Sequence, residues 1–187
     1  MGLGLGCAVF VGAGALARRR VTGTEARIFR WANGLPEGAF RAIWLPMQYG
    51  TFGAVPALAG LAFARRRLRL AVEIAAAGTG AWVLAKAAKA VVGRGRPAAI
   101  LRDVRHRGKE EGDLGFPSGH AAVSAALTLI AWPEGAIGWR LASATLSGFV
   151  PFSRLYVGAH LPLDVLGGSA LGIAVASLVD LAFCSET

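Results

Sequence analysis

The sequence has little cysteine and little acidic charge. Its two cysteines, Cys7 and Cys184, stand near opposite ends of the chain without a CxxC pair or a Cys/His spacing. Neither a zinc site nor a disulfide framework is therefore expected. Asp and Glu number 11 against 20 Lys and Arg, yet no soluble basic module accompanies the surplus. This balance argues against a nucleic-acid partner and favours anionic lipid or a phosphorylated substrate.

Long soluble stretches are also scarce. Hydrophobic residues make up 55% of the sequence and charged residues 17%, and the mean hydropathy is +0.52. Apolar runs of about 18 residues or more are typical of membrane-spanning helices. The 26 glycines would be costly in soluble helices but allow close packing between membrane helices. We therefore expect one all-α integral membrane domain over residues 1–187.

The apolar runs predict a bundle of six spans. The expected spans cover residues 3–17, 42–64, 70–92, 118–132, 136–152 and 161–183. Between the first two, the sequence predicts an interfacial amphipathic helix with Thr24 as N-cap and an end at Asn33-Gly34. Pro46 and Pro56 fall inside the second span, where membrane helices tolerate proline as a kink.

Alternation of the spans predicts which connections share a face of the membrane. Residues 18–41, 93–116 and 153–160 fall on one face, together with the polar residues that are candidates for chemistry. The basic turn at residues 65–69 falls on the other. Cytoplasmic loops carry an excess of Lys and Arg, so we expect this turn inside and the functional face outside the plasma membrane. The arginines of the first connection are candidates for binding substrate, so they are not counted as evidence for membrane orientation.

Ionisable residues within spans are costly, so each needs an explanation. Lys86 and Lys89 lie near the end of the third span, and Lys86 can simply extend its ammonium to the interface. Lys89 stands seven residues before Arg96, about two helical turns. Gly93 and Pro97 predict that the helix loosens in between. A lysine and an arginine are then expected to converge at a helix end.

Two histidines stand at the starts of expected spans. His160 and Asp164 are four residues apart, a spacing that places both on one helix face. A carboxylate beside an imidazole fixes its tautomer and raises its basicity, although a purely structural pair is the alternative. His120 follows Ser118 at the fourth span, where unsatisfied backbone N–H groups bind anions. Arg154 lies in the connection before His160.

Taken together, these groups are what phosphoryl transfer without a metal requires. Cations and N–H donors neutralise the phosphoryl oxygens, a nucleophile attacks in line, and an acid protonates the leaving oxygen. The sequence offers no clustered carboxylates for Mg²⁺, and Glu110, Glu111 and Asp113 form a loop charge run that we expect to be solvated. A non-enzymatic anion transporter is the alternative of another class, but it has no need of a nucleophile with an orienting carboxylate.

Three motifs resemble the three-part phosphatase motif of the type 2 phosphatidic acid phosphatase (PAP2) superfamily. They are Lys89-(six residues)-Arg96-Pro97, Pro117-Ser118-Gly119-His120, and Ser153-Arg154-(five)-His160-(three)-Asp164. No position departs from the pattern, and the six-span layout extends the similarity to nearly the whole chain. The superfamily also includes soluble vanadium haloperoxidases, but six spans favour the membrane lipid phosphatase branch.

The resemblance implies a role for each motif residue. His160 is expected to be the nucleophile that forms a phosphohistidine, with Asp164 orienting it and His120 as the general acid for the leaving group. The expected ligands of the phosphoryl oxygens are Lys89, Arg96, Ser118, Gly119 and Arg154, with Pro117 and Ser153 in support. Neither a cofactor nor a metal is implied.

The substrate expected from this resemblance is a lipid phosphate within the bilayer. A polyprenyl (undecaprenyl or decaprenyl) pyrophosphate is favoured, which would place a bacterial enzyme in recycling of the lipid carrier for cell-wall synthesis. Phosphatidic acid, phosphatidylglycerophosphate and polyprenyl-phosphosugar phosphatases remain the alternatives. We expect selectivity to lie in the first connection, in the loop at residues 102–113 and in lateral openings between helices.

Overall fold

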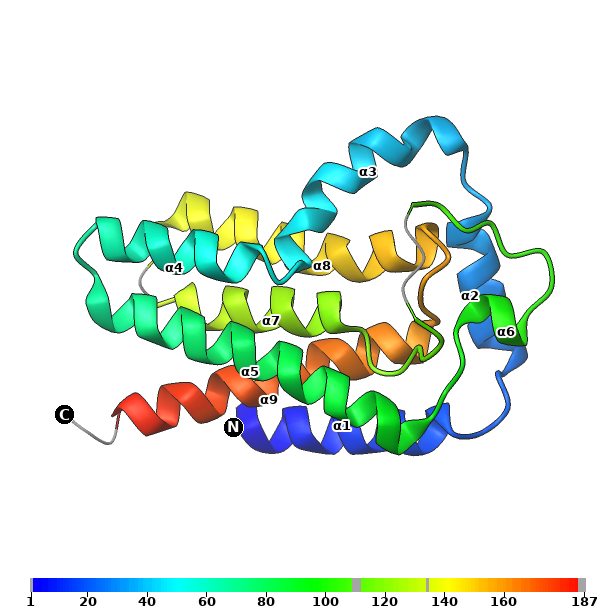
Figure 1. Ribbon diagram of the computed structural model, residues 1–187, viewed down its shortest axis with the longest axis horizontal. Coiled ribbons are helices and arrows are strands. Elements are labelled where there is room, and N and C mark those ends of the chain that lie inside the picture. The colour runs from blue at the N-terminus through cyan, green and yellow to red at the C-terminus, as the bar shows by residue number, and fades with distance from the viewer. Residues whose placement is uncertain (1, 109–111, 134, 185–187) are drawn as a thin grey trace.

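The computed structural model describes residues 2–108, 112–133 and 135–184 and is built from α-helices (Figure 1). Within these ranges there is no β-strand, which confirms the all-α expectation. The bundle consists of α1 (Gly2–Ala17), α4 (Ala54–Ala64), α5 (Leu68–Val92), α7 (Gly119–Ala131), α8 (Ile137–Tyr156) and α9 (Pro162–Cys184). The shorter helices are α2 (Gly23–Asn33), α3 (Phe40–Met47) and α6 (Pro97–Ile100). Helices α2 and α6 gather at one end of the bundle.

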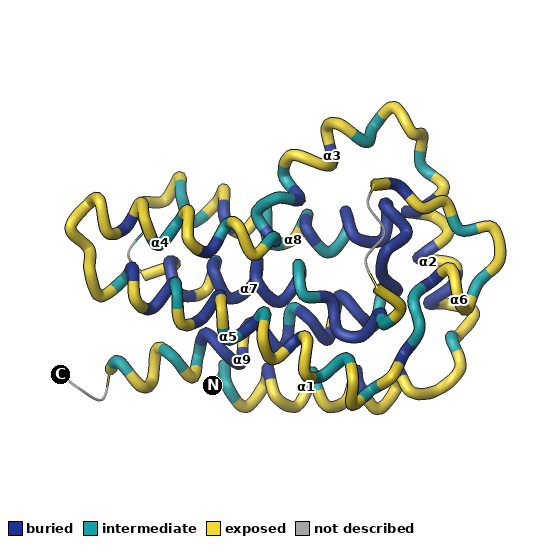
Figure 2. The backbone as a smooth tube through the Cα atoms, viewed as in Figure 1, coloured by how far each residue is buried: buried dark blue, intermediate teal, exposed yellow. Residues whose placement is uncertain are grey.

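Helix α7 is the centre of the bundle and is largely buried (Figure 2). It packs against α5, α8 and α9, and its many alanines let the neighbouring backbones come close. Gly172 of α9 shows how close: a Cβ added there would lie 2.1 Å from the carbonyl oxygen of Ala122. The contact holds together the two helices that carry His120 and Asp164.

Adding a methyl group at this contact is expected to destabilise the protein. Gly172→Ala should cost about 1–3 kcal/mol, because the new Cβ meets backbone that has no room to move. Gly12→Ala in α1 is the matched control, since a Cβ there meets nothing within 4 Å and alanine favours the helix. Thermal unfolding in detergent measures both variants. Equal midpoints for the two would contradict the close α7–α9 contact.

Helices α5 and α9 are suited to a bilayer. They are the two helices in the described part of the chain that are long and apolar enough to cross a membrane, judged by length and composition. At about 1.5 Å per residue they reach about 37 and 34 Å, against a hydrocarbon core of about 30 Å. The large apolar side chains that they expose are Leu68, Val72, Val83, Leu84, Val91, Leu166, Ile173, Leu178 and Leu181. Such a surface is favourable in contact with lipid tails, whereas its exposure to water would be costly.

The second expected span is not a single helix, so this prediction was wrong. Residues 42–64 divide into α3, the 3-10 turn Gln48–Gly50 and α4. The break follows from a tertiary contact, because a Cβ on Gly50 would lie 2.6 Å from the carbonyl oxygen of His120. The chain bends inward to reach the start of α7. Helices α1, α4 and α7 are apolar but short, at 16, 11 and 13 residues, so six spans are not confirmed.

Two element boundaries differ from expectation. The N-cap of α2 is Thr22 instead of Thr24, and its side chain accepts a hydrogen bond from the Glu25 N–H. Helix α8 continues to Tyr156, which places Arg154 on the helix and not in the connection after it. The ends of α2 at Asn33 and of α5 before Gly93, which has φ +67°, agree with the sequence prediction.

Candidate active site

The cations of the first motif connect the end of α5 to both histidine-bearing segments. Lys89, in the last turn of α5, donates from Nζ to the carbonyl oxygens of Leu114 and Gly115 at 2.9 and 3.1 Å. Arg96 donates from Nη1 to the carbonyl oxygen of Ala159 at 2.9 Å. Lys89 therefore contacts the segment that precedes α7, and Arg96 contacts the residue that precedes His160.

The second motif begins α7. Ser118 is the N-cap: its Oγ accepts from the Ala121 N–H at 3.4 Å, and its own N–H donates to the Asp164 carbonyl oxygen at 2.8 Å. Both Ser118 and Pro117 are fully buried. Gly119 and His120 form the first turn of α7 and are partly accessible. Ser118 thus caps the helix on its buried side, while Gly119 and His120 remain accessible.

The third motif shapes the turn between α8 and α9. The carbonyl oxygen of Arg154 accepts the N–H groups of Ala159 and His160 at 3.1 and 3.3 Å. Gly158 adopts φ +79°, and a Cβ there would lie 2.5 Å from the Arg105 carbonyl oxygen. Only glycine satisfies both constraints without strain. The result is a tight turn that fixes the backbone of His160 against the end of α8.

His160 and Asp164 face each other in the interior of the protein. His160 is 1% exposed and Asp164 0%, and 3.8 Å separate the histidine Nδ1 from the aspartate Oδ2. This distance exceeds that of a hydrogen bond, although such contacts often tighten only when substrate binds. Oδ2 accepts the Leu161 N–H at 2.8 Å. With Nδ1 turned toward the carboxylate, Nε2 is the imidazole nitrogen left for substrate.

A cavity of about 630 Å³ joins the first two motifs to the third. The motif residues that line it are Lys89, Arg96, Gly119, His120 and His160. Phe52 and Trp82 form an apolar wall, with ring centroids 4.7 Å apart. Lys86 also lines the cavity, and its Nζ lies 3.7 Å from the Trp82 ring centroid. The cavity therefore combines a cationic, histidine-bearing part with an apolar one.

Arg154 lies near His120 but does not line the larger cavity. It lines a smaller cavity of about 200 Å³, which shares His120 and Thr51 with the larger one. Its Nη1 donates to the Met47 sulfur at 3.5 Å. Ser153, by contrast, donates its hydroxyl to the Val150 carbonyl oxygen at 2.6 Å. The structure thus places Arg154 beside the site and turns Ser153 back into its own helix.

Sequence reasoning missed two buried charged residues, Glu25 and Arg94. Arg94 donates to the Glu25 carboxylate from both terminal nitrogens and to Asp164 Oδ1 from Nη1. Burial lowers the pKa of the Arg94 guanidinium, but the two carboxylates outweigh burial and raise that pKa above its usual value. The position of Arg94 inside the first motif, between Lys89 and Arg96, is a signal that could have pointed to it. No pattern in the sequence points to Glu25.

Of the three loop carboxylates, the structure describes Asp113. Glu110 and Glu111 lie outside the described residues, and Asp113 is exposed at the edge of the larger cavity. Among the residues that the structure describes, no group of three or more His, Cys, Asp or Glu side chains could hold a metal ion.

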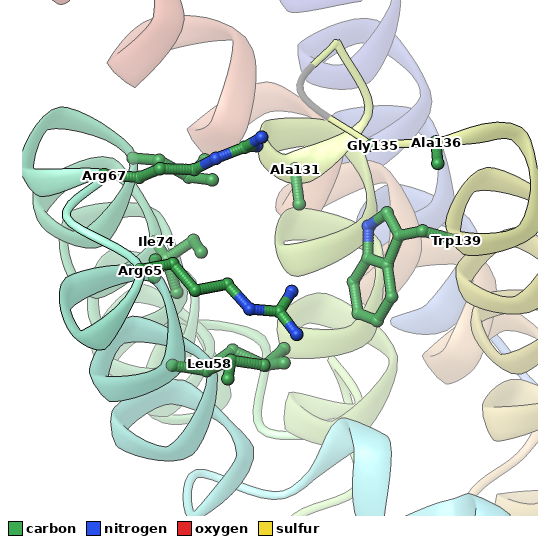
Figure 3. A pocket seen from close by; sticks show the side chains of 11 residues that line it. Leu58, Arg65, Arg67, Ile74, Ala131, Gly135, Ala136 and Trp139 are labelled. Atoms are coloured by element: carbon green, nitrogen blue, oxygen red, sulfur yellow. The ribbon is translucent and has the colours of Figure 1, made fainter.

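A cavity of about 280 Å³ at the opposite end of the bundle has a different character (Figure 3). Arg65 and Arg67 point into it from the α4–α5 turn, and Trp139 faces them from α8. Of the described residues that line it, none is a histidine or a carboxylate. This cavity lacks a nucleophile and an acid, so the chemistry belongs to the other end.

Two solved structures share this fold. The crystal structure of LpxE from Aquifex aeolicus superposes with a TM-score of 0.77 at 20% identity, over 86% of this chain and 96% of that chain. The crystal structure of the first transmembrane PAP2 type phosphatidylglycerolphosphate phosphatase from Bacillus subtilis gives a TM-score of 0.74 at 22% identity, over 97% and 96%. At this level of identity, the likeness concerns the fold alone.

Two comparisons of sequence go further. The undecaprenyl-diphosphatase of Sulfolobus acidocaldarius is 30% identical over 121 residues, 63% of this chain, and the match spans 57% of that relative's length. The family model of the PAP2 superfamily matches residues 67–183, a segment that contains all three motifs and more than half of the chain. The resemblance carried by the motifs is thereby confirmed: the chain belongs to the PAP2 superfamily.

Proposed function

We propose that the chain is an integral-membrane lipid phosphatase that works through a phosphohistidine at His160, without a metal. The observation that carries the proposal is the cavity of about 630 Å³ shared by His160, His120, Lys89 and Arg96. A nucleophile, an acid and two cations around one space are the parts that phosphoryl transfer needs. Membership in the PAP2 superfamily supports the phosphatase class.

In the first step, the lone pair of His160 Nε2 forms a bond to phosphorus. The bond from phosphorus to the leaving oxygen breaks, and that oxygen takes a proton from His120. Lys89 and Arg96 stabilise the charge on the equatorial oxygens. The Gly119 N–H at the start of α7 is placed to help, because the first N–H groups of a helix have no partner within it. Arg154 acts from the side of His120.

In the second step, His120 takes a proton from water as the water oxygen attacks phosphorus. The N–P bond breaks, its electron pair returns to His160, and inorganic phosphate leaves. Asp164 stabilises the positive charge that the ring carries between the two steps. The same histidine thus serves first as acid and then as base, as one carboxyl group does in retaining glycosidases.

The substrate that we favour is a polyprenyl diphosphate. Its leaving group is a lipid phosphate, which is itself anionic, and Lys86 supplies a third cation in the same cavity as Lys89 and Arg96. Phe52 and Trp82 offer an apolar wall for the start of the lipid tail. The curated relative is named undecaprenyl-diphosphatase, which supports recycling of a cell-wall lipid carrier as the task.

The proposed orientation places the active site at the outer face of the plasma membrane. The basic turn between α4 and α5 lies at the opposite end of the bundle from the start of α7 and the α8–α9 turn (Figure 1). Because short cytoplasmic loops are enriched in Lys and Arg, this turn is assigned to the inside.

A phosphatidylglycerophosphate phosphatase is the second candidate, and the fold likeness to the Bacillus subtilis structure of that name favours it. Both substrates are lipid phosphates, but the leaving oxygen of phosphatidylglycerophosphate belongs to an alcohol, whereas that of a polyprenyl diphosphate belongs to a phosphate. The charge on the leaving oxygen is therefore what separates the two candidates.

A substrate panel tests the proposal. Purified protein in detergent with EDTA should release phosphate from a polyprenyl diphosphate faster than from a polyprenyl monophosphate or phosphatidylglycerophosphate. Vanadate should inhibit, because it mimics five-coordinate phosphorus. His160→Ala protein prepared in the same way measures contaminating phosphatase. A strict requirement for Mg²⁺ would contradict the metal-free mechanism, and a preference for phosphatidylglycerophosphate would select the second candidate.

A further inference from the structure

A series of buried charged side chains connects α2 to His160. Arg94 donates to Glu25 at 2.9 Å from Nη1 and 2.8 Å from Nη2, and to Asp164 Oδ1 at 2.8 Å from Nη1. Glu25 and Arg94 are each 5% exposed. The other Asp164 oxygen, Oδ2, is the one that faces His160 Nδ1. The order of contacts is therefore Glu25, Arg94, Asp164, His160.

Attachment of α2 to the bundle does not by itself explain buried charges here. Helix α2 already packs through Phe29 and Ala32 in an apolar cluster with Leu155 and Leu161. Removing a carboxylate and a guanidinium from water costs free energy that the ion pair often only just recovers. Glu25 Oε1 also accepts the Leu163 N–H at the start of α9 at 3.1 Å, but a neutral amide oxygen could accept that bond as well. The charges therefore call for a reason connected with the site that they adjoin.

We propose that Glu25 and Arg94 are positioning residues for catalysis, which makes α2 part of the active-site apparatus. Arg94 holds the Asp164 carboxylate in place, and Glu25 balances the charge of Arg94, so that one net negative charge remains beside His160. The inference rests on the proposed function, because it takes His160 as the group that attacks phosphorus. Glu25 lies outside residues 67–183, the segment matched by the family model.

The sum of the charges explains why two carboxylates accompany one guanidinium. Glu25, Arg94 and Asp164 together carry one negative charge beside His160. That charge favours the cationic ring which develops as the N–P bond forms. Without Glu25, Arg94 would neutralise Asp164 and the sum would be zero. The ring cation would then lose an electrostatic partner in a buried site, where charges interact strongly.

Other charged or titratable groups also surround His160. They are Lys89 of α5, Arg96 before α6, His120 of α7 and Arg154 of α8. All four are cations or neutral at neutral pH, so none replaces the negative charge that Glu25 contributes. They stay unchanged in the variants below and form a constant background.

The test is the pH profile of kcat/KM for Glu25→Gln with the lipid phosphate that the wild type hydrolyses. Losing one negative charge disfavours protonation of His160, so the acid limb should move about one unit to lower pH. At the optimum, kcat should fall about tenfold. Glu73→Gln is the matched control, because Glu73 is also buried and paired with an arginine, Arg69, at 2.7 Å. Its profile should not move.

Two further variants separate charge from structure. In Glu25→Gln/Arg94→Gln the sum of charges returns to minus one, so the acid limb should return toward the wild type while kcat stays low. Arg94→Lys keeps the sum, so kcat should fall without a shift. A profile shape does not depend on the fraction of folded enzyme, whereas a merely structural role would change amplitude alone.

The outcomes distinguish this inference from the proposed function. If the wild type releases no phosphate from any lipid phosphate, the proposed function is wrong and the inference falls with it. If the wild type is active and the acid limb stays in place in Glu25→Gln, the inference alone is overturned. A shift in Arg94→Lys equal to that in Glu25→Gln would also overturn it, because the charge sum would then not be the cause.

Discussion

Replacing His160 by alanine should lower phosphate release by roughly 10³–10⁶-fold, because it removes the imidazole that is proposed to form the covalent bond. The N–H groups of His160 and of the preceding Ala159 donate to the Arg154 carbonyl oxygen, and His160 lies in the wall of the larger cavity. Its Nδ1 faces Asp164, which leaves Nε2 toward substrate. Without His160, water would have to attack phosphorus directly, and water is not held in position as the imidazole is.

The measurement combines turnover with covalent trapping. Wild-type enzyme quenched during turnover of a substrate with labelled phosphorus should carry an acid-labile, alkali-stable label, as expected of phosphohistidine. His160→Ala should carry none. His106→Ala is the control, because it removes the remaining histidine of the three in the chain and should still allow labelling. A label that persists in His160→Ala would assign the attack to a different residue.

The motifs made the location of the candidate site predictable, because each places its residues at the end of a helix. A lysine before a left-handed glycine, a serine cap before a histidine, and a histidine four residues before an aspartate are local patterns. The bundle brings these ends together once the helices pack. The buried surroundings of Ser118 could not be predicted from the motif: its hydroxyl caps α7 and lies in the interior, while its role as a phosphate ligand stays a prediction.

Contacts between distant segments were not predictable in this way. Glu25 and Arg94 are separated by 69 positions, and although Arg94 lies within the first motif, nothing along the chain indicates that the two side chains pair. The break between α3 and α4 has a similar origin. The prolines of this stretch suggested a kinked span, but the close approach of Gly50 to His120 decides where the chain turns. Such contacts depend on three-dimensional packing, which a pattern along the chain does not reveal.

Replacing His120 by alanine should have an effect that depends on the leaving group. With a lipid phosphate, loss of the general acid should lower kcat by about 10²–10⁴-fold. An activated ester such as p-nitrophenyl phosphate needs no proton on its leaving oxygen, so its first step should be much less affected. Because the same histidine is the proposed base for the second step, the phosphohistidine at His160 should then accumulate.

This accumulation is what separates the roles of the two histidines. Gly50 packs against the backbone carbonyl of His120. This contact does not involve the imidazole, so His120→Ala should keep the fold of the helix start. The experiment compares kcat for both substrates and the steady-state level of labelled enzyme in His120→Ala and the wild type. Equal losses on both substrates, with no rise in label, would mean that His120 binds phosphate instead of transferring protons. A smaller loss on the activated ester, with a higher label, is the result that only an acid and base at His120 produces.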